Sequence, residues 1–211
     1  MVEERKGILF RIIGILVLLQ FSRIMIKKQI FIFLPRTPLC YALVSAFLII
    51  AFIFFILGIA KKENIEIFTF PTKHKIIYAI CTFLSLGLLF STHVLTGDFS
   101  ILTIVNMIYS SVIIPVYEEL IFRGLCWNML KEENLSEFKI FIITTILFSV
   151  WHLGYVDSLA IRAFESRIVF VVLMKMVTGL CFGIVLGLTR YATKNNYSTI
   201  LLHGVMNIFG R

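Results

Sequence analysis

Two adjacent acidic residues, Glu118 and Glu119, stand at the end of a long apolar stretch, and Arg123 follows four positions after Glu119. Residues four apart share one face of a helix, so Glu119 and Arg123 are predicted to form an ion pair. Glu118 lies about 100° around that helix and is not engaged by this pair. A carboxylate in a water-poor site suits a general base that takes a proton from water. An interfacial acidic pair with an arginine anchor explains the same residues when they are taken alone.

Two histidines and an asparagine lie in other apolar segments. His152 follows Phe148 by four positions near the end of one segment, and His203 precedes Asn207 by four positions in the last one. Imidazole and carboxamide groups can hold a water molecule or donate hydrogen bonds to a developing oxyanion. Each of them alone is equally explained as an interfacial anchor or as hydrogen bonding between helices.

Polar groups inside a membrane are costly, by about 2.5–3.5 kcal/mol for a charged residue at a helix centre, so they are candidates for function. A carboxylate, an imidazole and a His/Asn pair on three separate apolar segments supply the groups that water-mediated amide hydrolysis needs. We therefore predict that Glu118, His152, His203 and Asn207 converge on one cavity.

A metal site is the alternative use of the same side chains. Glu118, His152 and His203 could supply three ligands and leave one position open, as in a catalytic zinc site. However, no HExxH pattern is present, and each ligand would come from a different segment. The sequence therefore favours a mechanism without metal or other cofactor, with zinc as the alternative. The four cysteines are far apart and form no CxxC pair, which argues against a disulfide framework or a structural zinc site.

The elements that must position these residues are membrane helices. Of the 211 residues, 59% are hydrophobic and 15% are charged, whereas soluble domains have roughly 45–50% apolar and about 25% charged residues. The pattern predicts an all-α, polytopic transmembrane helical bundle of about six to eight spans, with candidates at 7–22, 39–60, 76–96, 100–122, 139–156, 167–190 and 197–210. The net charge of +8 sits mostly in short stretches between these segments, as in loops of membrane proteins, which excludes nucleic acid as a partner.

The N-terminal region is harder to interpret. Residues 1–22 resemble a signal peptide in outline, but no small-x-small cleavage site follows, so the segment is predicted to be retained. The short apolar piece 29–34 is interpreted as interfacial or re-entrant. We divide the chain into N-terminal membrane helices and basic loops, 1–74, and a core, 75–211, within one membrane-embedded domain.

Two further features concern local structure. Pro115 removes the helix hydrogen bond to the Ser111 carbonyl and predicts a kink just before the carboxylates. His74 and His93 lie at predicted loop edges without nearby acidic residues, and we interpret both as solvated.

The three motifs together resemble those of a known family. Glu118-Glu119-x3-Arg123, Phe148-x3-His152 and His203-x3-Asn207 occur in this order, on predicted helices. They are similar to the ordered motifs of the CPBP intramembrane proteases, which include type II CAAX prenyl endopeptidases and bacterial Abi proteins linked to bacteriocin self-immunity. The resemblance extends over roughly residues 75–210.

The resemblance implies a role for each motif residue. Glu118 would be the catalytic glutamate and His152 its partner, while His203 and Asn207 would line the oxyanion site. Glu119 and Arg123 would support the site. The chain would then be a multi-pass intramembrane endopeptidase of the cell membrane that acts on a membrane-associated peptide or protein within the lipid bilayer. The short chain is more similar to the bacterial branch, in which peptide maturation or immunity is the analogy.

Two other classes of function are open. One is a non-enzymatic membrane immunity or scaffold protein, which would tolerate Glu118→Gln because glutamine keeps the shape of the side chain. The other is a small transporter that uses Glu118 and the histidines as a proton relay. We rank transport last, because the sequence has no paired broken helices and no inverted halves.

Overall fold

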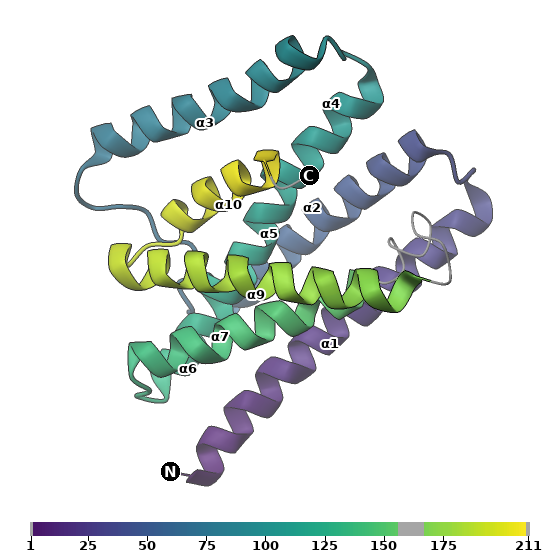
Figure 1. Ribbon diagram of the computed structural model, residues 1–211. Coiled ribbons are helices and arrows are strands. Elements are labelled where there is room, and N and C mark those ends of the chain that lie inside the picture. Colours follow the sequence, from purple (N-terminus) through teal and green to yellow (C-terminus); the bar gives the residue numbers. More distant parts are fainter. Residues whose placement is uncertain (1, 156–166, 210–211) are drawn as a thin grey trace.

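A computed structural model describes residues 2–155 and 167–209, and these residues form helices without any strand (Figure 1). Three helices come first, and a helical rod made of five consecutive pieces follows them. In chain order the elements are α1 (Val2–Phe33), α2 (Pro38–Lys62), α3 (Lys75–Thr96), then the rod α4 (Ile101–Ile108), η1 (Tyr109–Ile113), α5 (Ile114–Glu119), η2 (Leu120–Cys126) and α6 (Trp127–Glu132), and finally α7 (Glu137–Trp151), η3 (His152–Tyr155), α9 (Ile168–Thr193) and α10 (Tyr197–Phe209).

Six helices within the described residues are long and apolar enough to cross a membrane. They are Gly7–Phe33, Pro38–Lys62, Lys75–Thr96, Ile101–Glu132, Glu137–Tyr155 and Ile168–Thr193. The last helix, α10, has 13 residues and is shorter than a span. The predicted all-α polytopic bundle is confirmed, at the lower end of the expected number of spans.

The N-terminal helix is longer than the sequence suggested. We expected a span to end at residue 22 and 29–34 to form a separate interfacial piece, but α1 continues without interruption to Phe33. No proline occurs before Pro35, which disfavours helix in the residue before it. Arg23 and Lys27 do not end the helix, because they lie on its packed face and are only 1% and 5% exposed.

The helix that carries the carboxylates also continues past its predicted end. We expected it to end near residue 122, yet the rod runs from Ile101 to Glu132. Its two π-helical stretches, η1 and η2, lie on either side of α5. Single π turns inside helices occur frequently at functional sites. Here they accommodate Pro115 and leave both carboxylates in the middle of the rod.

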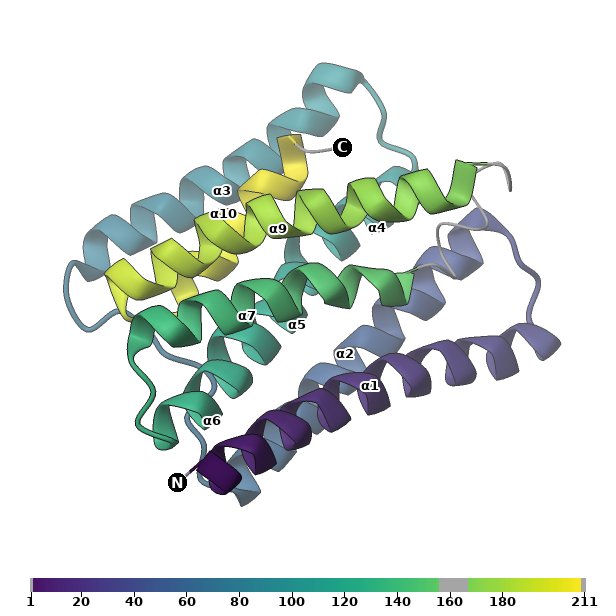
Figure 2. The ribbon, with the colours of Figure 1, turned by 60° about the horizontal axis from the view of Figure 1, so that its bottom comes forward.

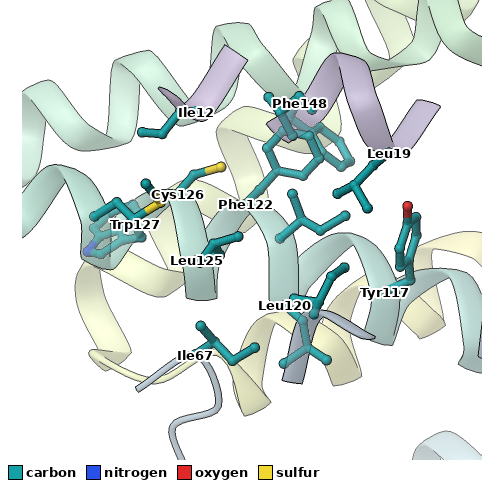
Figure 3. Packing of buried hydrophobic residues seen from close by; sticks show 14 of the residues in the cluster. Ile12, Leu19, Ile67, Tyr117, Leu120, Phe122, Leu125, Cys126, Trp127 and Phe148 are labelled. Carbon is teal, nitrogen blue, oxygen red and sulfur yellow. The ribbon is translucent and has the colours of Figure 1, made fainter. Parts of the chain in front are cut away.

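The hydrophobic core surrounds the C-terminal half of this rod, formed by η2 and α6. Side chains of η2 and α6 pack against α1, α7 and the loop after α2, as Figure 3 shows for Phe122, Trp127, Leu19, Phe148 and Ile67. The rings of Phe122 and Phe148 meet edge to face, with centroids 5.2 Å apart. Helices on both sides of the predicted boundary at residues 74 and 75 therefore contribute to one core.

Close packing of α7 against α9 depends on three glycines four positions apart. Gly179, Gly183 and Gly187 are buried on one face of α9, and the two helices lie side by side in both views (Figures 1 and 2). A Cβ atom at Gly187 would lie 2.6 Å from the ring of Phe141. Small residues at this spacing let membrane helices approach closely.

Helix α3 is the least embedded of the described helices. It lies at one edge of the bundle, beside α10 (Figures 1 and 2). Its buried residue is His93, whose Nδ1 lies 3.0 Å from the Asp98 carbonyl oxygen, so our interpretation of His93 as solvated was wrong. Thr103 and Ser100 donate hydrogen bonds to the Asp98 carboxylate, which lowers the pKa of that group.

Candidate active site

The two carboxylates of the first motif are both buried. Glu118 is 2% exposed and Glu119 is 0% exposed. Arg123 Nη1 donates to Glu119 Oε1 at 2.9 Å, so the predicted ion pair is present, and it is fully enclosed. Arg123 also donates to the Gly183 carbonyl at 3.2 Å, which ties the rod to α9. The pair is not near a helix end, because the rod continues through α6.

His203 lies between the two carboxylates. Its Nδ1 is 2.9 Å from Glu119 Oε1, and its Nε2 is 3.8 Å from Glu118 Oε2. A carboxylate acceptor at Nδ1 fixes the orientation of the ring and turns Nε2 toward Glu118. The sequence had paired Glu119 with Arg123 alone, and the structure adds His203 as its second partner.

His152 is fixed by the residue that precedes it by one helical turn. Its Nδ1 lies 2.8 Å from the Phe148 carbonyl oxygen. Because a carbonyl can only accept, Nδ1 carries the proton, and Nε2 of the neutral ring is an acceptor. The Phe148 ring packs edge to face on both His152 and His203, with centroid distances of 5.0 and 5.9 Å. These contacts explain why Phe148 and His152 are spaced four apart.

The His152 ring also depends on a glycine. A Cβ atom at Gly179 would lie 2.6 Å from His152 Nδ1, which is too close for any side chain. The glycine face of α9 therefore serves the site as well as the packing of α7. The signal for this was present in the sequence as Gly179-x3-Gly183-x3-Gly187, a pattern of small residues on one helix face.

Asn207 is held by a backbone carbonyl that the proline leaves available. In a π turn the N–H of residue 115 would reach the carbonyl of residue 110, but Pro115 has no N–H. Asn207 Nδ2 donates to the Ser110 carbonyl at 2.8 Å instead. Nearby, a Cβ atom at Gly204 would lie 2.6 Å from the Ser111 carbonyl oxygen, so α10 runs very close to η1.

One cavity of about 270 Å³ is lined by all four predicted site residues, Glu118, His152, His203 and Asn207. One water occupies roughly 30 Å³ in the liquid, so the cavity has room for more than a single nucleophile. The predicted convergence is therefore observed, across helices α5, α10 and the turn η3.

Tyr155 is a site residue that sequence reasoning missed. Its hydroxyl donates to Glu118 Oε1 at 2.6 Å, and Trp151 Nε1 donates to that hydroxyl at 3.4 Å. His152 and Tyr155 are the two ends of η3, a 3₁₀ turn in which residues three apart eclipse each other. An α-helical period does not reveal this alignment, so the sequence contained no clear signal for it.

Two N-terminal helices also reach the cavity. Arg23 and Lys27 of α1 and Tyr41 of α2 are among its lining residues. Lys27 Nζ donates to the Tyr41 hydroxyl at 2.7 Å and lies 4.4 Å from the centre of that ring. These residues precede the three motifs, so the motifs gave no indication that they line the cavity.

The zinc alternative can be compared with this geometry. Among residues 2–155 and 167–209, no three His, Cys, Asp or Glu side chains lie close enough together to hold a metal ion. Glu118 instead accepts a hydrogen bond from Tyr155, and Glu118 and His203 are separated by 3.8 Å. The side chains as arranged do not fit a three-ligand zinc site. The absence of a metal requirement stays a prediction.

Comparison with known families agrees with the motifs. The family model described as "Type II CAAX prenyl endopeptidase Rce1-like" matches residues 100–209, which is more than half of the chain. The chain belongs to this family. Neither a curated protein nor a solved structure matches this chain. The resemblance to the CAAX-protease group is thereby confirmed.

Membership of the Rce1-like family indicates the class of reaction and the kind of substrate. An Rce1-like chain is a hydrolase of the CAAX-type intramembrane protease class, and it acts on membrane-associated protein substrates. With six helices able to span a bilayer, it is a multi-pass membrane protein. The matched region contains the rod, α7, α9 and α10, whereas α1 to α3 lie outside it.

Proposed function

We propose that this chain is a glutamate-type intramembrane endopeptidase of the cell membrane, which hydrolyses a peptide bond in a membrane-associated peptide or protein. The observation that supports it best is the shared cavity of Glu118, His152, His203 and Asn207. Within it, Glu118 faces His203 Nε2 at 3.8 Å, a separation that leaves Oε2 available to a reacting water. Burial of these groups keeps bulk water away from the reaction.

Glu118 acts as the general base. Its Oε1 accepts the Tyr155 hydroxyl, so Oε2 takes the proton from the attacking water. His152 Nε2, the acceptor left by the Nδ1 contact with Phe148, accepts the second hydrogen of the same water and orients it. The water oxygen then bonds to the peptide carbonyl carbon, and the π electrons of the carbonyl move onto the carbonyl oxygen.

His203 and Asn207 stabilise the resulting oxyanion. With Nδ1–H directed at Glu119, His203 donates Nε2–H only when its ring carries both protons, and Glu119 together with the oxyanion balances that charge while Glu118 holds the proton of the water. Asn207 uses one amide N–H on the Ser110 carbonyl and offers the other. Collapse of the intermediate breaks the C–N bond, and Glu118 returns its proton to the leaving amine.

The test is peptide cleavage by purified protein in lipid nanodiscs. Fluorogenic peptides should be compared as a matched set, with the same sequence carrying a farnesylated CAAX end or no lipid, with and without a chelator. We expect cleavage that persists in chelator and is lost in Glu118→Gln, which keeps the side-chain shape but cannot take a proton. Loss of cleavage in the presence of chelator, with recovery when zinc is added, would replace the glutamate mechanism with a metal mechanism.

Wild-type turnover in Glu118→Gln would contradict the glutamate mechanism, whereas no cleavage of any peptide by the folded wild-type protein would favour the immunity or scaffold alternative. Folding of each variant should be checked by size-exclusion profile and thermal unfolding, so that an unfolded sample is not mistaken for an inactive enzyme. The ratio of cleavage between the farnesylated and lipid-free peptides then identifies the substrate class.

A further inference from the structure

The end of α7 presents carbonyl groups that need partners. The last four carbonyls of a helix have no partner within the helix, and inside a membrane each of them must be satisfied by the protein. Two side chains of α1 supply donors here. Gln20 Nε2 donates to the Trp151 carbonyl at 3.0 Å, and Arg23 Nη2 donates to the Gly154 carbonyl.

These two side chains form one unit on α1. Arg23 Nε donates to Gln20 Oε1 at 2.9 Å, so each fixes the other. Arg23 is 1% exposed, and its position continues the buried stripe of Ile12, Leu16 and Leu19. The guanidinium faces the bundle, and its cation is favourable beside the C-terminal end of a helix.

The guanidinium also touches the tyrosine that holds the base. Arg23 Cζ lies 4.8 Å from the centre of the Tyr155 ring, within the range of cation–π attraction. The Tyr155 hydroxyl donates to Glu118 at 2.6 Å. A chain of contacts therefore runs from α1 through Tyr155 to Glu118.

The side-chain amide of Gln20 lies directly against the backbone of the turn at Gly154. A Cβ atom at Gly154 would collide with the side-chain amide of Gln20. The turn η3 thus has α1 against one side, while Gly179 of α9 receives the His152 ring on another. With both contacts in place, His152 and Tyr155 have little freedom to turn away from the cavity.

We propose that Gln20 and Arg23 are positioning residues, which hold η3 so that Tyr155 reaches Glu118 and His152 faces the cavity. Neither is assigned to the reacting atoms, and both act through the turn. The proposal rests on the proposed peptidase function for its kinetic consequences. It extends the working site to α1, which lies outside the matched residues 100–209.

A substrate-independent experiment tests the structural link. Hydrogen exchange of the amides of residues 153–155 should be measured in nanodiscs for Arg23→Met and Gln20→Leu. The matched control is Arg11→Met, since Arg11 lies on the same helix in an exposed ion pair with Glu63. We expect exchange at least tenfold faster in the first two variants, unchanged exchange in the rod 101–132, and no change in the control. Wild-type exchange in both variants would overturn the proposal.

A double-mutant cycle tests the effect on catalysis. Arg23→Met and Tyr155→Phe should each lower kcat about tenfold with little change in KM, which corresponds to about 1.4 kcal/mol in the barrier. Their combination should cost no more than Arg23→Met alone, because the loss of Arg23 already releases Tyr155 together with the rest of η3. Arg23→Lys, which keeps the cation, should recover part of the loss. Additive losses, or a change in KM alone, would contradict the proposed route.

The outcomes separate this inference from the proposed function. If the folded wild-type protein cleaves no peptide, the peptidase proposal fails, whereas hydrogen exchange still reports whether α1 holds the turn. If Arg23→Met does not fold, the half-buried Gln20 provides the second variant. Gln20→Leu with wild-type exchange and wild-type kcat would then overturn the proposal.

Discussion

The two sides of α10 face two different cavities. On one side, His203 and Asn207 border the polar cavity of about 270 Å³ that contains Glu118. On the other, Ile200, Leu201 and Val205 border a cavity of about 180 Å³ between α10 and α3. Both cavities touch the same short helix, so their difference comes from which side chains each face presents.

The helices that complete each cavity differ in the same way. The polar cavity is closed by α9, whose glycines lie against α7 and whose Gly183 carbonyl accepts from Arg123 and Thr145. The apolar cavity is closed by α3, whose side chains are largely exposed. Precise polar geometry is therefore found where helices approach closely, and the loosely attached helix borders the side without titratable groups.

The largest effect should come from the polar face of α10. Asn207→Ala removes the donor to the Ser110 carbonyl and the amide offered to the oxyanion. We expect turnover per folded molecule to fall roughly a hundred- to a thousandfold, as for an oxyanion donor elsewhere. Ile208→Ala, one residue away on the apolar cavity, is the control and should leave turnover within about twofold while lowering thermal stability. Equal losses in both variants would show that the two faces are not functionally distinct.

A smaller loss is expected from the wall of the polar cavity. Gly179→Ala places a methyl group 2.6 Å from His152 Nδ1 and must displace the ring. Overpacking of this kind costs about 1–3 kcal/mol of folding stability. Because the displaced ring no longer orients the water, turnover should also fall, by roughly ten- to a hundredfold. Gly87→Ala in α3 meets no atom within 4 Å and should be neutral or slightly stabilising, since alanine favours helix. Steady-state kinetics and thermal unfolding of this matched pair measure the difference.

Breaking the buried ion pair should reduce folding more than rate. Glu119→Gln leaves Arg123 without its anionic partner, and removing one member of a buried pair costs about 3–5 kcal/mol. Folded yield should drop sharply, while turnover per folded molecule falls by less than about tenfold, because the glutamine oxygen still accepts from His203. The exposed pair of Arg11 and Glu63 provides the control Glu63→Gln, for which we expect a change below about 1 kcal/mol. A normal yield for Glu119→Gln would remove its supporting role.

The smallest effect should come from α3. Thr82 Oγ1 lies 2.7 Å from the Tyr197 hydroxyl and donates to the Tyr78 carbonyl at 2.7 Å. Thr82→Ala should lower stability by about 1 kcal/mol, the net contribution of a typical hydrogen bond, and should leave turnover unchanged within about twofold. Thermal unfolding and kinetics of the same preparation test this. A tenfold loss of turnover would place α3 in the catalytic apparatus and remove the contrast between the two cavities.

Several parts of this arrangement were predictable because they are local. The ion pair of Glu119 and Arg123 follows from i,i+4 spacing on any helix. The number of helices follows from apolar segment lengths, although two boundaries were wrong. Residues 29–34 belong to α1, and the helix after residue 100 extends to Glu132. In both helices a buried arginine, Arg23 or Arg123, lies inside the helix just beyond the apolar run that set the predicted boundary.

Other parts were unpredictable for an equally physical reason. Tyr155 reaches Glu118 only because η3 is a 3₁₀ turn, whose period differs from that of the helix before it. The Ser110 carbonyl becomes a partner of Asn207 only because a π turn shifts the bond that Pro115 cannot make. A change of helical period by one residue is decided by neighbouring helices, and a single apolar segment does not encode it.

The amino-acid sequence by itself determined that the chain forms membrane helices and which faces of those helices carry polar groups, because backbone in lipid must be hydrogen-bonded within each segment. Only the tertiary structure decided which polar side chains contact one another across helices. His203 joins Glu119 across 84 positions and Arg23 reaches Gly154 across 131. Such contacts depend on how closely two helices approach and at what rotation, and these follow from the packing of glycines and aromatic rings throughout the bundle.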